Sequence, residues 1–422
     1  MYGGDGLARL PADEHGRGKA VFLPFVLAGE KVEATLLEQK PGFARVRADA
    51  LLEASNYRVR PQCRYFGECG GCHYQHANYQ HQLEIKAAIL KENLRRIAKL
   101  ELATELIVRP SPAWNYRNRT RLKIQTQPEF ALGYYKLNSH ELLPITECPI
   151  SSPLINQAIA ASWRLGSRVD DKIQEVEFFV NADDTQLLLD VDCAPGISAE
   201  VARRVAEQMQ EALPGVAGVT VRNADGKNRA SAELPAIATR GANKLDYHTR
   251  HSAYRVSTGA FFQTNRFLID QLIGIVTEGV SGDLALDLYA GVGLFSTVLS
   301  RSFAQVVAVE SSPTSHADLF YNSPSHVKAV RSTTEQFMKT AAGKLQPNLV
   351  VADPPRGGLG EAVVRSLIGL GAGRITYVSC DPATLSRDLV GLLQAGYRIQ
   401  QAHVVDLFPQ TYHVESVFHL VR

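Results

Sequence analysis

The second half of the sequence constrains the fold most, because after residue 250 short apolar runs alternate with helix-like stretches. The runs are LALDLY (284–289), VVAVE (306–310), LVVADPP (349–355) and ITYVSC (375–380). This alternation, at the spacing of βαβ units, predicts a parallel, doubly wound α/β sheet. Ligands of such sheets bind at the carboxyl ends of the strands, so the residues that end these runs are candidates for a functional site.

The loop after the first run, DLYAGVGLFS, is one such candidate. Asp287 lies near the strand end, and Gly291 and Gly293 let the backbone approach a ligand before a helix begins. The second strand ends in Glu310, a carboxylate suited to accept hydrogen bonds from ribose hydroxyls. The loop lacks the full G-x-G-x-x-G pattern and a P-loop lysine, which disfavours a pyrophosphate ligand. We therefore expect a nucleoside without phosphates, such as S-adenosylmethionine.

Cys380 stands where the run ITYVSC meets the helix-like segment DPATLSRDL. Asp381 can cap this helix, and Pro382 suits its first position. A thiol at a helix N-terminus has its thiolate favoured, which makes Cys380 a candidate nucleophile. The alternative is a buried cysteine at a strand end. The ligand-type residues at the other strand ends favour the nucleophile.

The turn VADPPRGGLG bears on the reaction. Methyltransferases of exocyclic amino groups use an acidic-Pro-Pro turn followed by an aromatic residue, but Arg356 follows the prolines here, so amino methylation is disfavoured. A thiolate suits carbon 5 of a pyrimidine, because its addition to carbon 6 makes carbon 5 nucleophilic. A base must then remove the carbon-5 proton. Glu415 is the predicted base, with an ordinary surface carboxylate as the alternative, and Asp353 is expected to contact the pyrimidine or the cofactor.

Four of the six cysteines form a separate group. Cys63, Cys69 and Cys72 lie in CRYFGECGGC, and Cys148 follows at a distance. The sequence has neither a signal-peptide pattern nor a long apolar run, so we expect a cytoplasmic protein with reduced thiols. Four thiolates suit zinc or an iron–sulfur cluster, and the spacing does not decide between them. Cys193 is expected to be a small buried hydrophobe.

The N-terminal third carries the features of a nucleic-acid partner. Residues 1–57 read as short strands broken by Gly and Pro, which predicts a small β-barrel, with a structural module without ligand as the alternative. Residues 51–125 hold 13 Lys and Arg against 6 Asp and Glu, while the rest of the chain is slightly acidic. The pattern of residues 80–100 predicts a helix, and we expect its row of basic side chains to be exposed to solvent. A strand after this helix would align four cations on one face: Arg117, Arg119, Arg121 and Lys123. Because like charges repel, we expect an anionic partner at this face.

With these motifs assembled, the chain resembles the RNA uracil-C5 methyltransferase family, in particular its iron–sulfur type that makes 5-methyluridine in 23S ribosomal RNA. The resemblance covers nearly the whole chain. It rests on CRYFGECGGCHYQHA with Cys148, YRNRTRLKI, FFQTN, DLYAGVGLFS, DPPRGGL, SCDPATLSRDL and FPQTYHVES.

The resemblance implies a role for each site residue. It implies a [4Fe-4S] cluster on Cys63, Cys69, Cys72 and Cys148, S-adenosylmethionine contacts from Gln263, Tyr289, Glu310 and Asp353 beside the Gly291 loop, and Cys380 as nucleophile with Glu415 as base. Two departures stand out: the barrel lacks its usual first strand, and Asp381 replaces an asparagine, which can raise the pKa of Cys380.

The implied organisation interleaves three parts. A TRAM/OB-like RNA-binding barrel covers 1–57, a central α+β domain with the iron–sulfur site covers 58–79 and 108–255, and a Rossmann-like S-adenosylmethionine-dependent methyltransferase domain covers 80–107 and 256–422. The expected partner is RNA, ribosomal RNA before transfer RNA, with no DNA or membrane partner and a monomeric protein. A transfer-RNA enzyme, a cytosine methylase and a non-catalytic RNA-binding protein are the alternatives.

Overall fold

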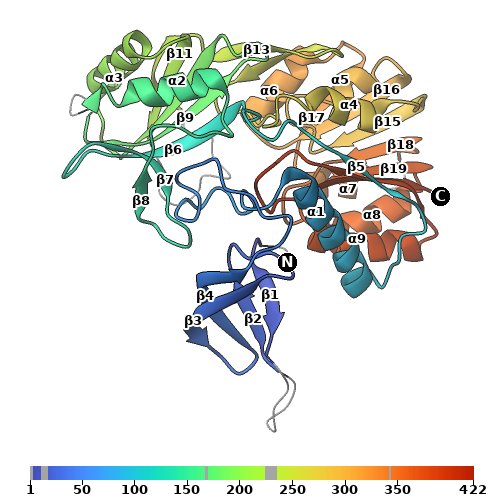
Figure 1. The fold of residues 1–422 in the computed structure, drawn as a ribbon. Helices are drawn as coiled ribbons and strands as arrows, with labels where there is room; N and C mark the ends of the chain where they lie inside the picture. Colours follow the sequence, from blue (N-terminus) through green and yellow to red (C-terminus); the bar gives the residue numbers. More distant parts are fainter. Residues whose placement is uncertain (1–2, 11–17, 167–169, 224–234, 342–343) are drawn as a thin grey trace.

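Four β-sheets and their covering helices make up the fold in the computed structural model, which describes residues 3–10, 18–166, 170–223, 235–341 and 344–422 (Figure 1). The N-terminal sheet lies below two larger α/β layers, one built from the middle of the chain and one from its last third. In the described part of the chain, no helix is long and apolar enough to cross a membrane.

The largest sheet has eight strands and forms the doubly wound core that the sequence predicts. In spatial order they are β17 (Val327–Arg331), β16 (Phe303–Glu310), β15 (Gly282–Leu288), β18 (Leu349–Ala352), β19 (Arg374–Ser379), β21 (Glu415–Val421), β20 (Arg398–Val405) and β5 (Leu106–Arg109). The first five are parallel, whereas β21 is antiparallel to both β19 and β20. The carboxyl ends of β15, β16, β18 and β19 therefore meet at one edge.

Helices cover both faces of this sheet, because successive side chains of a buried strand alternate between two apolar cores. One core takes side chains from α4 (Ile269–Thr277), α5 (Ser296–Leu299) and α6 (Pro313–Asn322). The other takes them from α1 (Tyr79–Asn93), α7 (Thr334–Ala341), α8 (Gly360–Leu370) and α9 (Pro382–Gln394). Neighbouring residues such as Leu349 and Val350 point into opposite cores.

Two elements of this layer come from far upstream in the chain. The predicted helix at 80–100 is α1, continued by a π-helical turn, Leu94–Ala98, and both pack against α9. β5 then pairs in parallel with β20 and completes the sheet edge. In the sequence, the residues of the middle layer are thus inserted between β5 and the other strands of this sheet.

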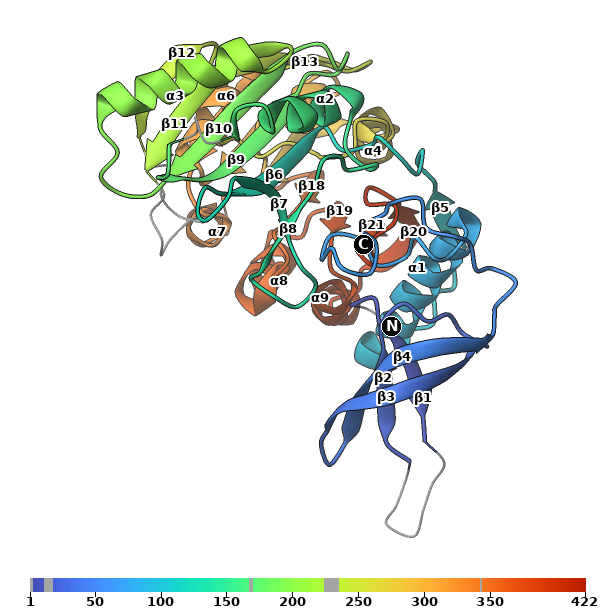
Figure 2. The same cartoon turned by 60° about the vertical axis from the view of Figure 1, so that its left-hand side comes forward.

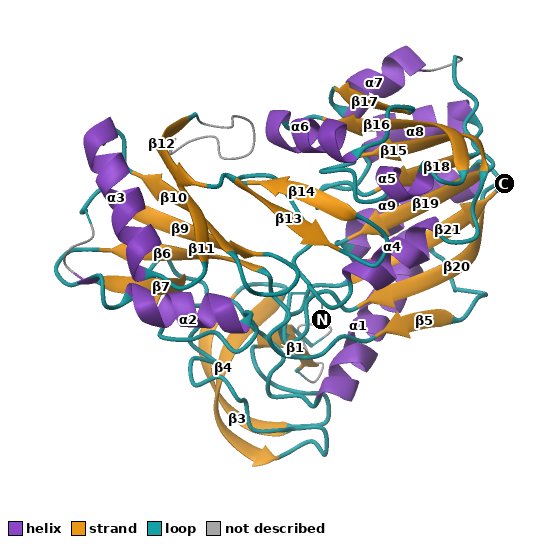
Figure 3. Cartoon of the chain, turned by 90° about the horizontal axis from the view of Figure 1, so that it is seen from above, coloured by secondary structure: helices purple, strands orange, loops and turns teal. Residues whose placement is uncertain are grey.

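The middle layer is a seven-stranded sheet with α2 (Pro153–Ser162) and α3 (Ala199–Ala212) together on one face (Figure 3). Its order is β12 (Ala236–Gly241), β11 (Val216–Asn223), β10 (Leu187–Cys193), β9 (Ile173–Val180), β6 (Arg119–Gln125), β7 (Ala131–Tyr135) and β8 (Leu142–Pro144). A hairpin, β13 (Lys244–His248) and β14 (Ala253–Ser257), joins it to the eight-stranded layer, whose apolar core it shares. Cys193 is fully buried in the core, as expected.

The N-terminal sheet has the order β1 (Gly6–Arg9), β2 (Ala20–Leu23), β4 (Phe43–Glu53) and β3 (Lys31–Gln39). It is open, since no pairing between β1 and β3 is found among the described residues, so the predicted barrel is not confirmed. Its apolar core is small, with Val21, Leu23 and Ala44 at its centre. Figure 2 shows this sheet beside the end of α1.

Candidate active site and cysteine cavity

Cys380 and Glu415 lie next to the last residue pair of two antiparallel strands. Ser379, the last residue of β19, pairs with Ser416 of β21. Cys380 directly follows Ser379 and Glu415 directly precedes Ser416, and the charge of Glu415 raises the pKa of Cys380. Glu415 is buried, with 5% of its surface exposed. The structure therefore brings the predicted nucleophile and the predicted base together from positions far apart in the sequence.

The thiol of Cys380 stands at the start of α9, as the sequence predicts. Asp381 caps this helix, its Oδ1 accepting hydrogen bonds from the amides of Ala383 and Thr384 at 3.0 and 2.9 Å, and Pro382 occupies the first turn. Burial, and then the charges of the nearby Glu415 and Asp353, nevertheless raise the pKa of Cys380 to about 12. The expectation that the helix end favours the thiolate is therefore wrong for the ligand-free protein, because burial and like charge outweigh it.

Three carboxyl groups near the strand ends hold their protons unusually tightly. Burial, and then the charge of Asp287, raise the pKa of Asp353 to about 7, and burial raises the pKa of Asp287 itself to about 7. Burial and then Asp353 also raise the pKa of Glu415. Gln263 Nε2 donates to Asp353 Oδ2 at 3.4 Å. A cation arriving here would lower these pKa values, so the cluster is suited to a positively charged ligand.

The glycine loop is held against the second strand by a carboxylate. Glu310 Oε2 accepts from the amide of Gly291 at 2.8 Å, and its Oε1 accepts from the amide of Ser312 at 2.7 Å. Tyr289 adopts a positive φ of 63°, and Gly291 one of 56°. The predicted contacts Gln263, Tyr289, Gly291, Glu310 and Asp353 thus come from the ends of adjacent strands and the segment before α4.

The four clustered cysteines line one cavity of about 310 Å³. Burial raises the pKa of Cys69 to about 11 and that of Cys72 to about 12, and in both cases Cys148 contributes next among the charges. Within the described residues, no group of three or more ligand side chains converges on a single ion. A four-iron cluster binds each thiolate at a separate iron, so an all-thiolate set around one cavity fits such a cluster, and the same donor set is also open to zinc.

The row of cations on β6 is paired within the protein. Arg121 binds Glu175 and Glu177 at 3.1 and 2.9 Å, and Lys123 also binds Glu175. Arg119 lies 3.6 Å from Glu177. These carboxylates lie on β9, the neighbouring strand. The prediction that the aligned cations require a foreign anion is therefore wrong for these three, because the protein supplies the anions.

Arg117 differs from its neighbours, because it lines both the cysteine cavity and a larger one of about 800 Å³. Its Nε has no hydrogen-bond partner among the described residues. Arg356 and His413 lie in the wall of the larger cavity with 3.4 Å between Nη2 and Nε2, and the charge of Arg356 acts on Cys380. The wall of the larger cavity thus contains an arginine whose charge reaches Cys380.

Sequence reasoning missed most of this wall, because it is assembled from separate segments. Its cations and aromatic side chains come from the N-terminal sheet and the turn after β2, the residue that follows Cys72, β7 and the turn after it, and the loop before β21: Phe25, Arg45, His73, Tyr134, Tyr135, Lys136, His140 and Tyr412.

The fold and this strand-end site define an S-adenosylmethionine-dependent methyltransferase, and comparisons identify the family. The family model described as tRNA (Uracil-5-)-methyltransferase matches residues 78–422. The chain belongs to this family and is an RNA uracil-C5 methyltransferase.

Relatives agree with this assignment, and a solved structure shares the fold. A protein of Aquifex aeolicus named as an uncharacterized RNA methyltransferase is 32% identical, over 99% of this chain and 95% of its own. The 23S rRNA (uracil(1939)-C(5))-methyltransferase of Aromatoleum aromaticum is 31% identical, over 96% and 95%. The crystal structure of Pyrococcus abyssi tRNA (uracil-54, C5)-methyltransferase with S-adenosyl-L-homocysteine superposes with a TM-score of 0.75 at 23% identity, covering 99% of this chain and all of that one, which shows the fold.

Proposed function

We propose that this enzyme methylates carbon 5 of a uridine in 23S ribosomal RNA through a covalent Cys380 adduct. Relatives named for this reaction on 23S rRNA, from Aromatoleum aromaticum and Pseudomonas fluorescens, are 31% and 30% identical over nearly the whole chain. A transfer-RNA substrate is the second candidate, since the similar solved structure is that of a transfer-RNA enzyme.

The position of Cys380 near Glu415 carries the mechanism. The thiol first loses its proton to solvent, from which the released thiolate regains it at the end, and the thiolate adds to carbon 6 of the uracil, which makes carbon 5 nucleophilic. S-adenosylmethionine, when bound, supplies an electrophilic methyl group that carbon 5 takes up. Glu415, in its carboxylate form, then removes the carbon-5 proton, and the carbon 6–sulfur bond breaks to release the thiolate. The net products are 5-methyluridine, S-adenosylhomocysteine and one proton, which Glu415 carries.

Protonation prepares the site for this order of steps. The raised pKa values of Glu415 and Asp353 keep protons on the carboxyl groups while the site holds no cation. A sulfonium cation beside Asp353 would lower these pKa values and free Glu415 to act as a base. The positive charge of Arg356 already lowers the pKa of Cys380 in part.

The large cavity suits an RNA strand with its target base turned out of the stack. It combines cations with exposed and half-buried aromatic rings, the combination used to bind phosphates and to stack unpaired bases. A base in an RNA helix is inaccessible to a nucleophile, so the uridine has to leave its stack to reach Cys380.

The four cysteines Cys63, Cys69, Cys72 and Cys148 would hold the [4Fe-4S] cluster. Their shared cavity and all-sulfur donor set fit such a group. The methylation transfers no electrons, so the cluster would act by cross-linking the cysteine loop to Cys148 and by adding negative charge near Arg117.

Methyl transfer from labelled S-adenosylmethionine tests the proposal. Unmodified 23S ribosomal RNA and transfer RNA transcripts are incubated with enzyme, digested to nucleosides and separated, with Cys380→Ala as the control. Label in 5-methyluridine from the ribosomal transcript alone supports the proposed substrate. Label from transfer RNA alone supports the second candidate, and label that persists in Cys380→Ala contradicts the covalent mechanism.

A further inference from the structure

The loop between β20 and β21 is irregular in backbone yet almost entirely buried. Asp406, Leu407, Gln410 and Thr411 each have at most 3% of their surface exposed. β21 begins at Glu415, so this loop sets where the base enters the active site. A buried irregular segment needs partners for its polar groups, and these partners come from other parts of the chain.

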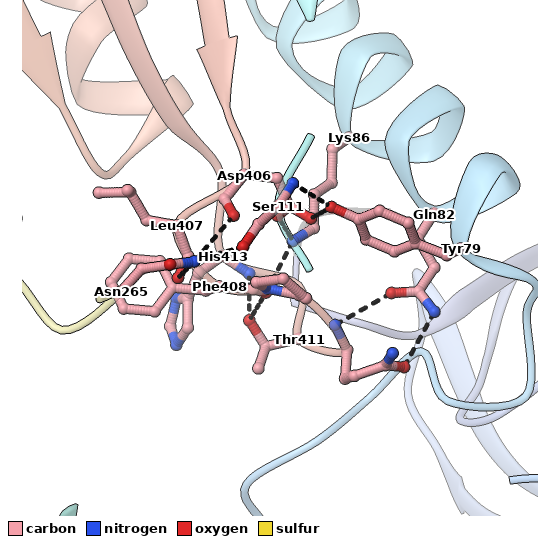
Figure 4. Close-up of polar contacts among 12 residues, drawn as sticks. Tyr79, Gln82, Lys86, Ser111, Asn265, Asp406, Leu407, Phe408, Thr411 and His413 are labelled. Carbon is pink, nitrogen blue, oxygen red and sulfur yellow. Dashed lines mark hydrogen bonds and ion pairs between the residues drawn. The ribbon is translucent and has the colours of Figure 1, made fainter. Parts of the chain in front are cut away.

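The helix α1 binds this loop through three side chains (Figure 4). Gln82 and Gln410 form a reciprocal pair, with Gln82 Nε2 donating to Gln410 Oε1 at 2.9 Å and the Gln410 amide donating to Gln82 Oε1 at 3.0 Å. Lys86 Nζ donates to Asp406 Oδ1 at 2.5 Å and to the carbonyl of Phe408 at 2.8 Å. The hydroxyl of Tyr79 donates to the other Asp406 oxygen at 2.8 Å.

The segment that directly follows Cys72 binds the same loop from another side. The amides of His73 and Tyr74 both donate to the carbonyl of Gln410, at 2.8 and 2.9 Å. These residues directly follow Cys72. Gln410 has a φ of 68°, a left-handed conformation that costs energy for a side chain without special local support, so these bonds hold a strained point of the loop.

Net stability does not explain the ion pair between Lys86 and Asp406. Both side chains are fully buried. Removing two charges from water costs about as much as their attraction returns, so apolar side chains of similar size would serve stability equally well. Directional bonds from a buried ammonium group, in contrast, fix the course of the backbone that they contact.

We propose that Gln82 and Lys86 are positioning residues for methylation: they hold residues 406–413 so that Glu415 stays near Cys380. The inference rests on the proposed function, in which Glu415 takes the carbon-5 proton. Loss of either side chain would leave thiolate addition and methyl transfer in place and slow proton removal. The methylated adduct would then persist.

Paired variants on α1 test the inference. Lys86→Met is compared with Lys91→Met, and Gln82→Met with Gln80→Met, since Lys91 and Gln80 are exposed on the same helix. Each enzyme receives RNA and labelled S-adenosylmethionine, and both turnover and the labelled protein–RNA adduct on a denaturing gel are measured. We expect about 10- to 100-fold lower turnover with more adduct than wild type for the buried positions, and wild-type behaviour for the exposed ones.

The outcomes for these variants, together with a parallel Glu415→Gln enzyme, separate the possible failures. Lower turnover without added adduct, or turnover unchanged in Gln82→Met, overturns the inference, because a merely structural role lowers all steps together. Glu415→Gln is run in parallel, and if it gives no adduct, both the proposed base and this inference are wrong. Gln82→Met leaves no buried charge unpaired, so it carries the test if Lys86→Met does not fold.

Discussion

The amide of Gly291 donates to a carboxylate oxygen of Glu310 at 2.8 Å, so this side chain fixes the glycine loop. In the proposed function the same carboxylate would also bind the ribose of the cofactor. Glu310→Gln removes the charge from this bond and from the proposed ribose contact. We expect about 10- to 100-fold weaker S-adenosylmethionine binding, the range for losing a charged hydrogen bond. Titration calorimetry measures it, with the exposed Glu361→Gln as control. Equal affinity in both variants would contradict the assignment.

Cys380→Ala should abolish methyl transfer, by more than about 10³-fold, because the nucleophile is lost. RNA and cofactor affinities should stay close to wild type. Cys193→Ala serves as the matched control, since that thiol is buried in the core of the middle layer, away from the strand-end site. Comparable loss of activity in the two variants would show that folding, and not the nucleophile, is responsible.

Glu415→Gln should stop the reaction after methyl transfer, because the amide cannot accept the carbon-5 proton. A labelled protein–RNA adduct should then collect on a denaturing gel. Adduct formation equal to wild type would remove Glu415 from the role of base.

The raised pKa of Asp353 predicts how stability depends on pH. Between about pH 4 and pH 7 the folded protein keeps a proton that the unfolded chain has lost, so the free energy of unfolding falls as pH rises through this window. Asp353→Asn removes that dependence. Between about pH 5 and pH 7.5, the free energy of unfolding of the wild type should fall by about 2 kcal/mol more than that of the variant, since one pKa unit corresponds to about 1.4 kcal/mol. Denaturant unfolding measures both. The same pH dependence of the free energy of unfolding in wild type and variant would contradict the raised pKa of Asp353.

Two arginines of the same segment should behave differently. Arg117→Met should weaken RNA binding and reduce the slope of log affinity against log salt by about 1, because Arg117 lines the large cavity. Arg121→Met should lower the melting temperature and leave RNA affinity unchanged, because Arg121 pairs with Glu175 and Glu177. Filter binding at several salt concentrations checks both, and equal losses of affinity would refute the distinction.

We expect the wild-type protein to bind about four iron and four sulfide ions per chain, measured after anaerobic purification. Cys148→Ser should lower both contents. Wild-type protein without iron would contradict the proposed cluster. Cys193→Ala is again the control, since Cys193 lies outside the cavity.

The sequence was informative where function depends on short local patterns. Cys380 follows a strand and precedes a capped helix, and this arrangement is written in consecutive residues. The pairing of Arg121 with Glu175 was not visible, because it depends on which strands become neighbours. The raised pKa of Cys380 likewise arises from burial and from carboxyl groups at other strand ends. Local chemistry could thus be predicted, whereas the electrostatic environment required the fold.

The upstream origin of α1 and β5 affects how this protein can be made and divided. Lys86 and its partner Asp406 are 320 residues apart in the chain. During synthesis the eight-stranded catalytic layer cannot be completed until its last strands leave the ribosome. The middle layer is able to form earlier. A fragment that begins at residue 256 would lack β5 and leave the edge of β20 bare, which favours aggregation. The catalytic layer is therefore no separable module, and truncation studies have to keep residues 79–109.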